Sequence, residues 1–260
     1  GRYIYLENKN IKVIFNKLEG LTIGGCWFKN VSPSPLFGTL PHGYYDDISL
    51  GADYFSGHAI VEIPGEHKIT DLAGCNPSIF INPEDSSIVM RITIEDRGVC
   101  FDNKIIIGQY SLKFVKEVSF PLRRLSKIHP SNFTFIPNSW DKNSLFFATN
   151  NGGEAIEKFS LTKNEVNHSQ LLSSLISAKY GLGATEGKII IGDTKKSVCF
   201  EHNLQNSALI PSIYYKKTEE GNYFFRLQYS AQEMDETFVE KKEEQKLKVC
   251  LKIALCQNMR

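Results

Sequence analysis

Acid–base side chains are most concentrated between residues 40 and 71, in the sequence LPHGYYDDISLGADYFSGHAIVEIPGEHKITD. This stretch holds three of the six histidines, with four aspartates, two glutamates and three tyrosines. Imidazoles titrate near neutral pH and carboxylates accept hydrogen bonds, so this mixture of groups can transfer protons or bind a polar ligand. We therefore expect a functional site in or beside this stretch.

His42 is the first candidate for a general acid or base, because it lies between a proline and two tyrosines in a loop-like context. The alternative is a loop histidine whose ring is hydrogen-bonded to the backbone. Asp46 and Asp47 are adjacent, so on an extended strand their carboxylates face opposite sides and do not form a pair. One of them is expected to accept hydrogen bonds from a turn, and Asp46 is retained as a candidate ligand contact.

Asp53, Tyr54 and His58 are expected to line one surface. Aromatic rings stack on sugar faces, whereas carboxylates and imidazoles bind hydroxyl groups, so the three are candidate contacts for a sugar. Glu62 interrupts the apolar run 59–63, where a buried and unpaired charge would be costly. It therefore either points to solvent or marks a cleft. His58, Glu62 and His67 lack the HExxH spacing of a zinc site, so we expect neither a metal nor a cofactor.

Trp140 is the other aromatic candidate, in the sequence PNSWDKN. Its polar neighbours suggest a turn in which the indole is exposed as a platform for a sugar. A tryptophan that covers the edge of the core from a loop is the alternative. No GxSxG motif is present, and no glycine-rich segment has the pattern of a phosphate loop.

Composition limits the partners. The 30 basic and 29 acidic residues leave a net charge of +1, which argues against nucleic acid and against a polybasic membrane surface. No apolar run approaches the roughly 18 residues of a transmembrane helix.

The six cysteines form no CxxC pair and have apolar neighbours, which predicts buried free thiols in a reducing compartment. We therefore expect a cytoplasmic protein.

The elements that must position these residues are predicted from a dominant period of two. Expected strands cover residues 3–6, 11–15, 21–28, 59–63, 78–81, 88–94, 104–107, 110–120, 133–136, 145–148, 155–161, 188–191, 198–200, 209–215, 223–228 and 246–255. Few short helices are expected, the best at 169–177, and residues 231–242 form either a helix or a solvated loop. The pattern predicts an all-β chain of large antiparallel sheets, in a sandwich or a barrel.

One domain is expected over residues 1–260, because no linker-like change of composition divides the chain. Its weakest joint is residues 121–137, where charges and prolines interrupt the pattern. The chain begins with Gly1 instead of methionine. This start suggests a domain cut from a longer chain.

The opening sequence resembles a known family. The segment YLENKNIKVIFNKLEGLTIGGCWF is similar to the entry of the galactose mutarotase-like β-supersandwich: a strand, a turn, and a strand with a glycine pair. In this chain the glycine pair is Gly24 and Gly25. Aldose epimerases use this fold as their catalytic domain, and several glycoside hydrolases carry it beside a catalytic barrel. The resemblance covers about the first thirty residues.

The resemblance implies two functions of different classes. The first is a sugar-binding or accessory domain of a glycoside hydrolase, with a mono- or oligosaccharide and a catalytic domain outside this chain as partners. The alternative is a self-contained aldose 1-epimerase-like enzyme, with His42 and Glu201 as its catalytic groups. The residues around both groups depart from the epimerase pattern, which favours the accessory domain. A third alternative is a structural domain without a ligand.

Overall fold

The computed structural model describes residues 1–41, 53–120, 125–149, 155–161, 181–183, 187–202, 209–217, 223–231, 239–240 and 245–256. Their regular elements are β-strands and two short 3₁₀ helices, η1 (Lys17–Glu19) and η2 (Pro137–Ser139). This confirms the predicted all-β class. No helix in these ranges is long and apolar enough to cross a membrane. The helix predicted at 169–177 lies outside the described residues.

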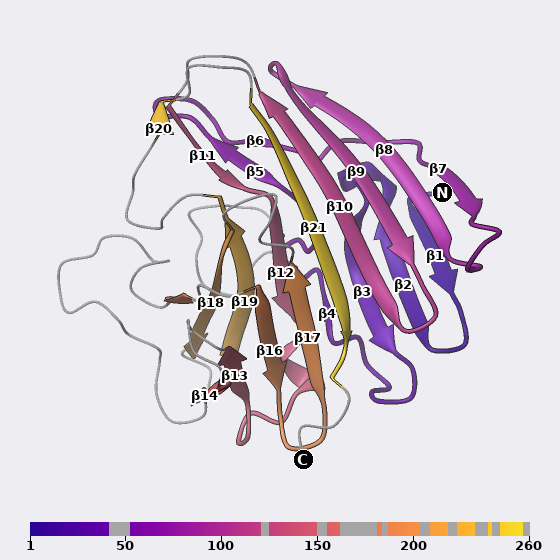
Figure 1. The fold of residues 1–260 in the computed structure, drawn as a ribbon, viewed down its shortest axis with the longest axis vertical. Coiled ribbons are helices and arrows are strands. Elements are labelled where there is room, and N and C mark those ends of the chain that lie inside the picture. The colour runs from indigo at the N-terminus through magenta and orange to yellow at the C-terminus, as the bar shows by residue number, and fades with distance from the viewer. Residues whose placement is uncertain are drawn as a thin grey trace.

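Two large antiparallel sheets form the molecule (Figure 1). The eight-stranded sheet has the order β1 (Tyr3–Glu7), β2 (Ile11–Asn16), β3 (Thr22–Phe28), β4 (Phe37–Gly38), β12 (Ser131–Phe135), β19 (Tyr223–Ser230), β18 (Ile210–Lys217), β15 (Gly181–Gly183). The nine-stranded sheet has the order β14 (Glu157–Ser160), β13 (Phe146–Thr149), β16 (Lys188–Gly192), β17 (Ser197–His202), β21 (Gln245–Leu255), β10 (Ser111–Phe120), β9 (Val99–Ile107), β8 (Ile88–Asp96), β7 (Ser78–Ile81).

A third, smaller sheet has the order β20 (Val239–Glu240), β11 (Leu125–His129), β5 (Ile60–Glu62), β6 (Ile69–Thr70). It contains the C-terminal part of the stretch 40–71. Residues 239–240 form a strand, so the helix considered for 231–242 is wrong at this position. Within residues 121–137, where a strand was expected only from residue 133, the structure forms β11 and β12 on either side of Pro130.

The core lies between the two large sheets and is rich in phenylalanine. Phe133 of β12 lies 5.3 Å from Phe200 of β17 and 5.7 Å from Phe114 of β10, measured between ring centroids. Because β12 belongs to one sheet and β10 and β17 to the other, these contacts join the two layers. Burial of such rings outweighs the cost of ordering the strands that carry them.

The strand β21 occupies the middle of the nine-stranded sheet, between β17 and β10 (Figure 1). Its register with β10 runs from Phe120 opposite Gln245 to Ser111 opposite Ala254. Alternation of side chains places Leu251 and Ile253 in the core, where both are almost fully buried. Leu247, Val249 and Leu255 alternate in the same way and also pack in or against the core. The residues between them face away from the core, and this outer face of the sheet carries the site described below.

The glycine pair of the N-terminal resemblance lies where β3 meets the short strand β4. Gly25 pairs with Gly38, and a Cβ atom on Gly38 would lie 2.5 Å from the carbonyl oxygen of Gly24. A side chain on Gly25 would collide with the ring of Trp27. The absence of side chains at these positions therefore permits the close approach of the two strands.

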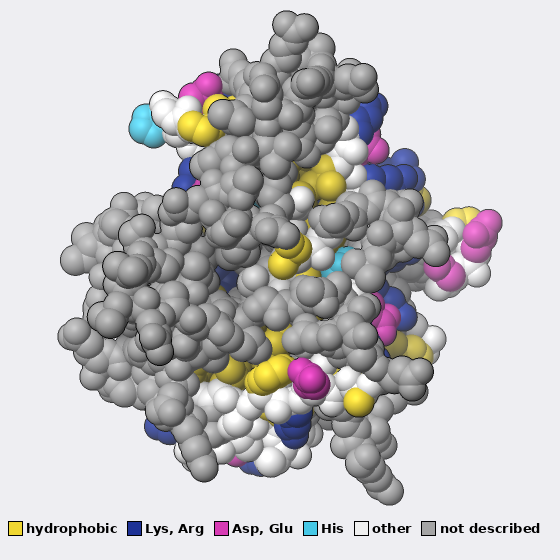
Figure 2. All heavy atoms as spheres, turned by 60° about the vertical axis from the view of Figure 1, so that its left-hand side comes forward, with side chains coloured by type: hydrophobic (Ala, Val, Ile, Leu, Met, Phe, Trp, Pro, Cys, Tyr) yellow, Lys and Arg dark blue, Asp and Glu magenta, His cyan; other side chains and the backbone are white. Residues whose placement is uncertain are grey.

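Charged groups of both signs are present among the described side chains in Figure 2. Where this face is coloured, it shows lysine or arginine, acidic and hydrophobic side chains. All six cysteines are free thiols, as predicted. Only Cys26 and Cys199 are buried, however, and the other four are partly exposed.

Candidate functional site

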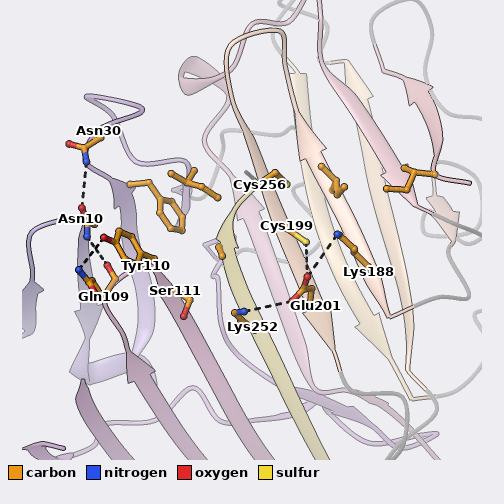
Figure 3. Close-up of a pocket in the computed structure, with 15 residues that line it drawn as sticks. Asn10, Asn30, Gln109, Tyr110, Ser111, Lys188, Cys199, Glu201, Lys252 and Cys256 are labelled. Atoms are coloured by element: carbon orange, nitrogen blue, oxygen red, sulfur yellow. Dashed lines mark hydrogen bonds and ion pairs between the residues drawn. The ribbon is translucent and has the colours of Figure 1, made fainter. Parts of the chain in front are cut away.

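A pocket opens on the outer face of the nine-stranded sheet, beside the turns that join the N-terminal strands (Figure 3). Its volume is about 1150 Å³. The lining residues are Asn10, Phe28, Asn30, Gln109, Tyr110, Ser111, Ile156, Lys188, Ile190, Cys199, Glu201, Lys252, Ala254, Leu255 and Cys256. They come from segments far apart in the sequence, which the sheet register brings together.

Three charged residues form the polar floor of the pocket. Lys188 pairs with Glu201 in the register of β16 and β17, and Glu201 pairs with Lys252 in the register of β17 and β21. The Glu201 carboxylate therefore lies between two ammonium groups, at 4.0 Å from Lys188 and 3.9 Å from Lys252. Its neighbour Phe200 faces the core, so strand alternation directs Glu201 outward.

These ion pairs are long and exposed. The side chains of Glu201 and Lys252 are 46% and 52% exposed. Exposed pairs of this kind contribute only about 0–1 kcal/mol, because water screens them and ordering the long side chains costs entropy. The three charged groups can therefore turn toward a ligand at little cost in stability.

Amides and an aromatic ring form the opposite wall of the pocket. The amide of Asn10 donates to the carbonyl oxygen of Gln109 at 3.0 Å, which holds the β1–β2 turn against the β9–β10 turn. The Gln109 amide donates to the Tyr110 hydroxyl at 3.1 Å, and the Tyr110 side chain is exposed. An exposed ring beside amides and charged groups is suited to a ligand rich in hydroxyls.

The predicted residues Asp53, Tyr54 and His58 lie elsewhere, against the eight-stranded sheet. The backbone of Tyr54 exchanges hydrogen bonds with Leu40, at 2.8 and 3.2 Å, and its side chain packs against the cluster of Leu40, Ile136 and Tyr214. Asp53 and Tyr54 each make further interactions. None of the three residues lines the pocket that contains Glu201.

His58 is buried, with 4% of its surface exposed. Burial, reinforced by the neighbouring Arg226 guanidinium, lowers the pKa of His58 well below its ordinary value. Arg226 Nη2 lies 3.4 Å from His58 Nε2 and donates to the carbonyl oxygen of Phe55 at 3.2 Å. His58 is therefore neutral at pH 7 and suited to accepting a hydrogen bond rather than to holding a proton for transfer.

Glu62 neither points freely into solvent nor marks the pocket. Its carboxylate pairs with Lys68 at 2.9 Å and with His129 at 3.8 Å, and its side chain is 27% exposed. The hydrogen bond from His129, followed by the contacts with Lys68, lowers its pKa to about 2 against the opposing effect of burial. The charge is therefore paired within the smallest sheet.

Trp140 covers the core instead of forming an exposed platform. It is 5% exposed, its ring packs edge-on against Phe135 and Phe225, and its Nε1 donates to the carbonyl oxygen of Leu36 at 3.0 Å. Its position therefore agrees with the second interpretation of its sequence context, a tryptophan that covers the edge of the core. The polar neighbours concealed this burial, because η2 turns the indole inward immediately before it.

Among the predicted site residues that the structure describes, Glu201 alone lines the pocket. His42 and Asp46 lie outside the described residues, so the proposed pairing of His42 with Glu201 stays a prediction. The sequence reasoning missed Tyr110, Lys188 and Lys252. A signal for Lys252 was available, since it alternates with apolar residues in the last strand, but its proximity to Glu201 depends on the pairing of β17 with β21.

Among the residues that the structure describes, no group of three or more histidine, cysteine, aspartate or glutamate side chains could hold a metal ion. No protein-family model matches the sequence, and a search of curated proteins finds no match.

Several solved structures share the fold. Slr1438 from Synechocystis sp. PCC 6803 is 10% identical, with a TM-score of 0.57 over 98% of this chain and 96% of that one. A putative aldose 1-epimerase from Escherichia coli K12 is 12% identical, with a TM-score of 0.51 over 98% and 99% of the two chains. The GH36 alpha-galactosidase AgaA from Geobacillus stearothermophilus, in complex with stachyose, is 9% identical, with a TM-score of 0.59.

In that last comparison, the aligned region covers 98% of this chain but only 40% of the alpha-galactosidase chain. At these identities the likeness establishes the architecture alone. The chain has the galactose mutarotase-like β-supersandwich fold that its opening residues implied.

Proposed function

We propose that this chain is a carbohydrate-binding β-supersandwich domain, accessory to a glycoside hydrolase, and that the Glu201 pocket receives its mono- or oligosaccharide ligand. One observation carries the proposal: the in-register charges Lys188, Glu201 and Lys252 face the exposed ring of Tyr110 across one pocket (Figure 3). Charged groups bind sugar hydroxyls, and the ring offers an apolar face to the C–H groups of a pyranose.

The alternative is a self-contained aldose 1-epimerase-like enzyme. It is supported by the similarity to a putative aldose 1-epimerase that this chain covers over 99% of its length. Epimerisation requires one group that protonates the ring oxygen and another that removes the anomeric proton. Glu201 would be one of them, with His42 as its predicted partner.

An NMR titration with a panel of mono- and oligosaccharides tests both functions, with saturation transfer between anomers recorded in each sample. The accessory domain predicts saturable binding with no faster exchange of anomers. The enzyme predicts faster exchange that Glu201→Gln abolishes. If no sugar perturbs the resonances of the pocket residues, both functions fail, and the third alternative, a structural domain without a ligand, takes their place.

Matched variants locate the binding site. Glu201→Gln should weaken binding about tenfold, since a charge-assisted hydrogen bond contributes roughly 1.5–3 kcal/mol. Its control is Glu117→Gln, because Glu117 pairs with Lys246 at 3.7 Å on the same sheet but does not line the pocket. Tyr110→Ala should weaken binding about fivefold, through the loss of stacking. Its control is Tyr5→Ala, at another exposed tyrosine.

The extent of the domain is part of the proposal. If residues 1–260 behave as one domain, denaturant unfolding followed by tryptophan fluorescence and by circular dichroism should give one coincident transition. Separate transitions would divide the chain.

A further inference from the structure

Two cysteines lie side by side in the floor of the pocket, next to Glu201 (Figure 3). Cys199 is on β17, and Cys256 immediately follows the end of β21. Cys199 lies opposite Ala254, and the backbone N–H of Cys256 donates to the carbonyl oxygen of Ser197 at 3.0 Å. The two cysteines are therefore diagonal neighbours on the same face of an antiparallel pair.

The two thiols differ in exposure. Cys199 is 6% exposed and packs with Phe146, Ala148 and Ile190. Cys256 is partly exposed and packs on the edge of that cluster. A reagent that enters the pocket therefore meets the more exposed Cys256 first, with Cys199 beside it.

The surroundings also distinguish Cys256 from the other cysteines. A hydrogen bond from the Cys199 thiol, with support from Ser197 and Lys188, lowers the pKa of Cys256 despite partial burial. The same contact with Cys256, together with burial, raises the pKa of Cys199. Burial also raises the pKa values of Cys26, Cys75 and Cys100.

The Cys199 proton has two acceptors. Its Sγ lies 3.6 Å from Glu201 Oε1, and it also hydrogen-bonds to the sulfur of Cys256. A single S–H group can donate fully to only one of them. When Cys256 ionises, the proton is drawn toward the Cys256 thiolate, and the Glu201 charge remains balanced by its two lysines.

We propose that Cys256 and Cys199 form a thiol-modification site that reacts with low-molecular-weight disulfides. The Cys256 thiolate attacks one sulfur of the reagent, forming a mixed disulfide and releasing one reagent thiolate. Cys199 then loses its proton to solvent and attacks the Cys256 sulfur, which forms the Cys199–Cys256 bond and releases the second reagent thiolate. The two protein thiols are oxidised by two electrons, and the reagent disulfide is reduced to two thiols.

The position of the pair makes this bond reversible. Diagonal residues of an antiparallel pair have Cα atoms about 7–8 Å apart, whereas disulfides normally span about 4.4–6.8 Å. Closure must therefore shift Cys256 from its position opposite Ser197 toward Cys199, which its place just beyond the end of β21 permits. Strained disulfides of this kind are easily reduced and belong to regulatory rather than structural bonds.

The test uses the reduced full chain, treated at neutral pH with an excess of oxidised glutathione and then blocked with N-ethylmaleimide. Peptide mass mapping should find a Cys199–Cys256 linked peptide, lighter than its reduced parts by two hydrogen atoms. Cys199→Ser should stop the reaction at glutathione on Cys256, and Cys256→Ser should leave Cys199 unmodified. Cys250→Ser, on the same strand, should behave as the wild type.

A measurement on the wild type keeps the proposal testable if a variant fails to fold. Brief alkylation with iodoacetamide should label Cys256 about tenfold faster than the fully buried Cys26 and faster than Cys100 and Cys250. The proposal is overturned if Cys256 is not the first cysteine to react. It is equally overturned if oxidation yields only glutathione adducts or disulfides between two chains.

Discussion

Asp71 and Lys116 form an ion pair in the core, with 3.1 Å between Oδ2 and Nζ and with side chains that are 1% and 2% exposed. Asp71 also accepts hydrogen bonds from the backbone N–H of Ala59 at 2.7 Å and from the Asn103 amide at 2.9 Å. Lys116 donates to the carbonyl oxygen of Gly57. The pair therefore ties the backbone on both sides of His58 to β9 and β10.

Removing one partner of this pair should be strongly destabilising. Lys116→Met leaves the Asp71 carboxylate buried without its counter-charge and should lower the free energy of unfolding by about 3–5 kcal/mol. The matched control is Lys246→Met in the exposed pair with Glu117, expected to cost less than about 1 kcal/mol. Urea unfolding measures both, and the double variant Asp71→Asn/Lys116→Met should recover part of the loss. Equal effects of Lys116→Met and Lys246→Met would contradict the burial of the pair.

Two buried histidines should make the protein less stable in mild acid. Burial lowers the pKa of His202 from 6.5 to about 4, and burial also lowers the pKa of His58 well below its ordinary value. The unfolded chain therefore binds protons that the folded chain resists, so stability is complete above about pH 6.5 and is lost as the pH falls toward about 4. Urea midpoints measured across this window should decline, and His202→Gln should make the decline shallower. An unchanged slope in His202→Gln would contradict the assignment.

Glu62 should make the free energy of unfolding depend on pH in a second, more acidic range. Its pKa is lowered from 4.5 to about 2 by His129 and Lys68, so its contribution is present above about pH 4.5 and is lost as the pH falls toward about 2. In Glu62→Gln this part of the pH dependence should disappear, and the unfolding free energies of variant and wild type should converge at the acidic end. Parallel curves down to that pH would mean that the carboxylate is not paired in the folded state.

The close approach of β3 and β4 should exclude any side chain at Gly38. Gly38→Ala places a Cβ atom 2.5 Å from the carbonyl oxygen of Gly24, and the strands must separate at a cost of about 1–3 kcal/mol. Gly74→Ala is the matched control, because no heavy atom lies within 4 Å of its Cβ position. Thermal unfolding should place Gly38→Ala well below Gly74→Ala, and equal melting temperatures would rule out this packing.

Most of the fold was predictable from local pattern. Long strands such as Ile88–Asp96 and Gln245–Leu255 alternate apolar and polar residues and were identified nearly at their observed limits. The strands Phe37–Gly38, Ile69–Thr70 and Val239–Glu240 were missed because two residues are too short to show a period. Their positions depend on partner strands that are distant in the sequence.

The site was less predictable, because its residues come from separate segments. Glu201 was identified by its type and late position, but no local pattern indicates that Lys188 and Lys252 flank it. The dense stretch 40–71 attracted attention to His58 and Glu62, whose side chains instead make contacts within the fold. A high density of polar and titratable residues in the sequence thus marked a region where polar side chains are buried. It did not mark the region where the pocket opens.

The central place of β21 has a consequence for synthesis on the ribosome. Residues 245–256 are made after every other described strand, yet they lie between β17 and β10. Until they emerge, both neighbours present unpaired edges, and the two parts of the nine-stranded sheet have no strand to join them. On the nascent chain, the strands that precede β21 therefore cannot complete the nine-stranded sheet. That sheet is completed only when β21 inserts between β17 and β10.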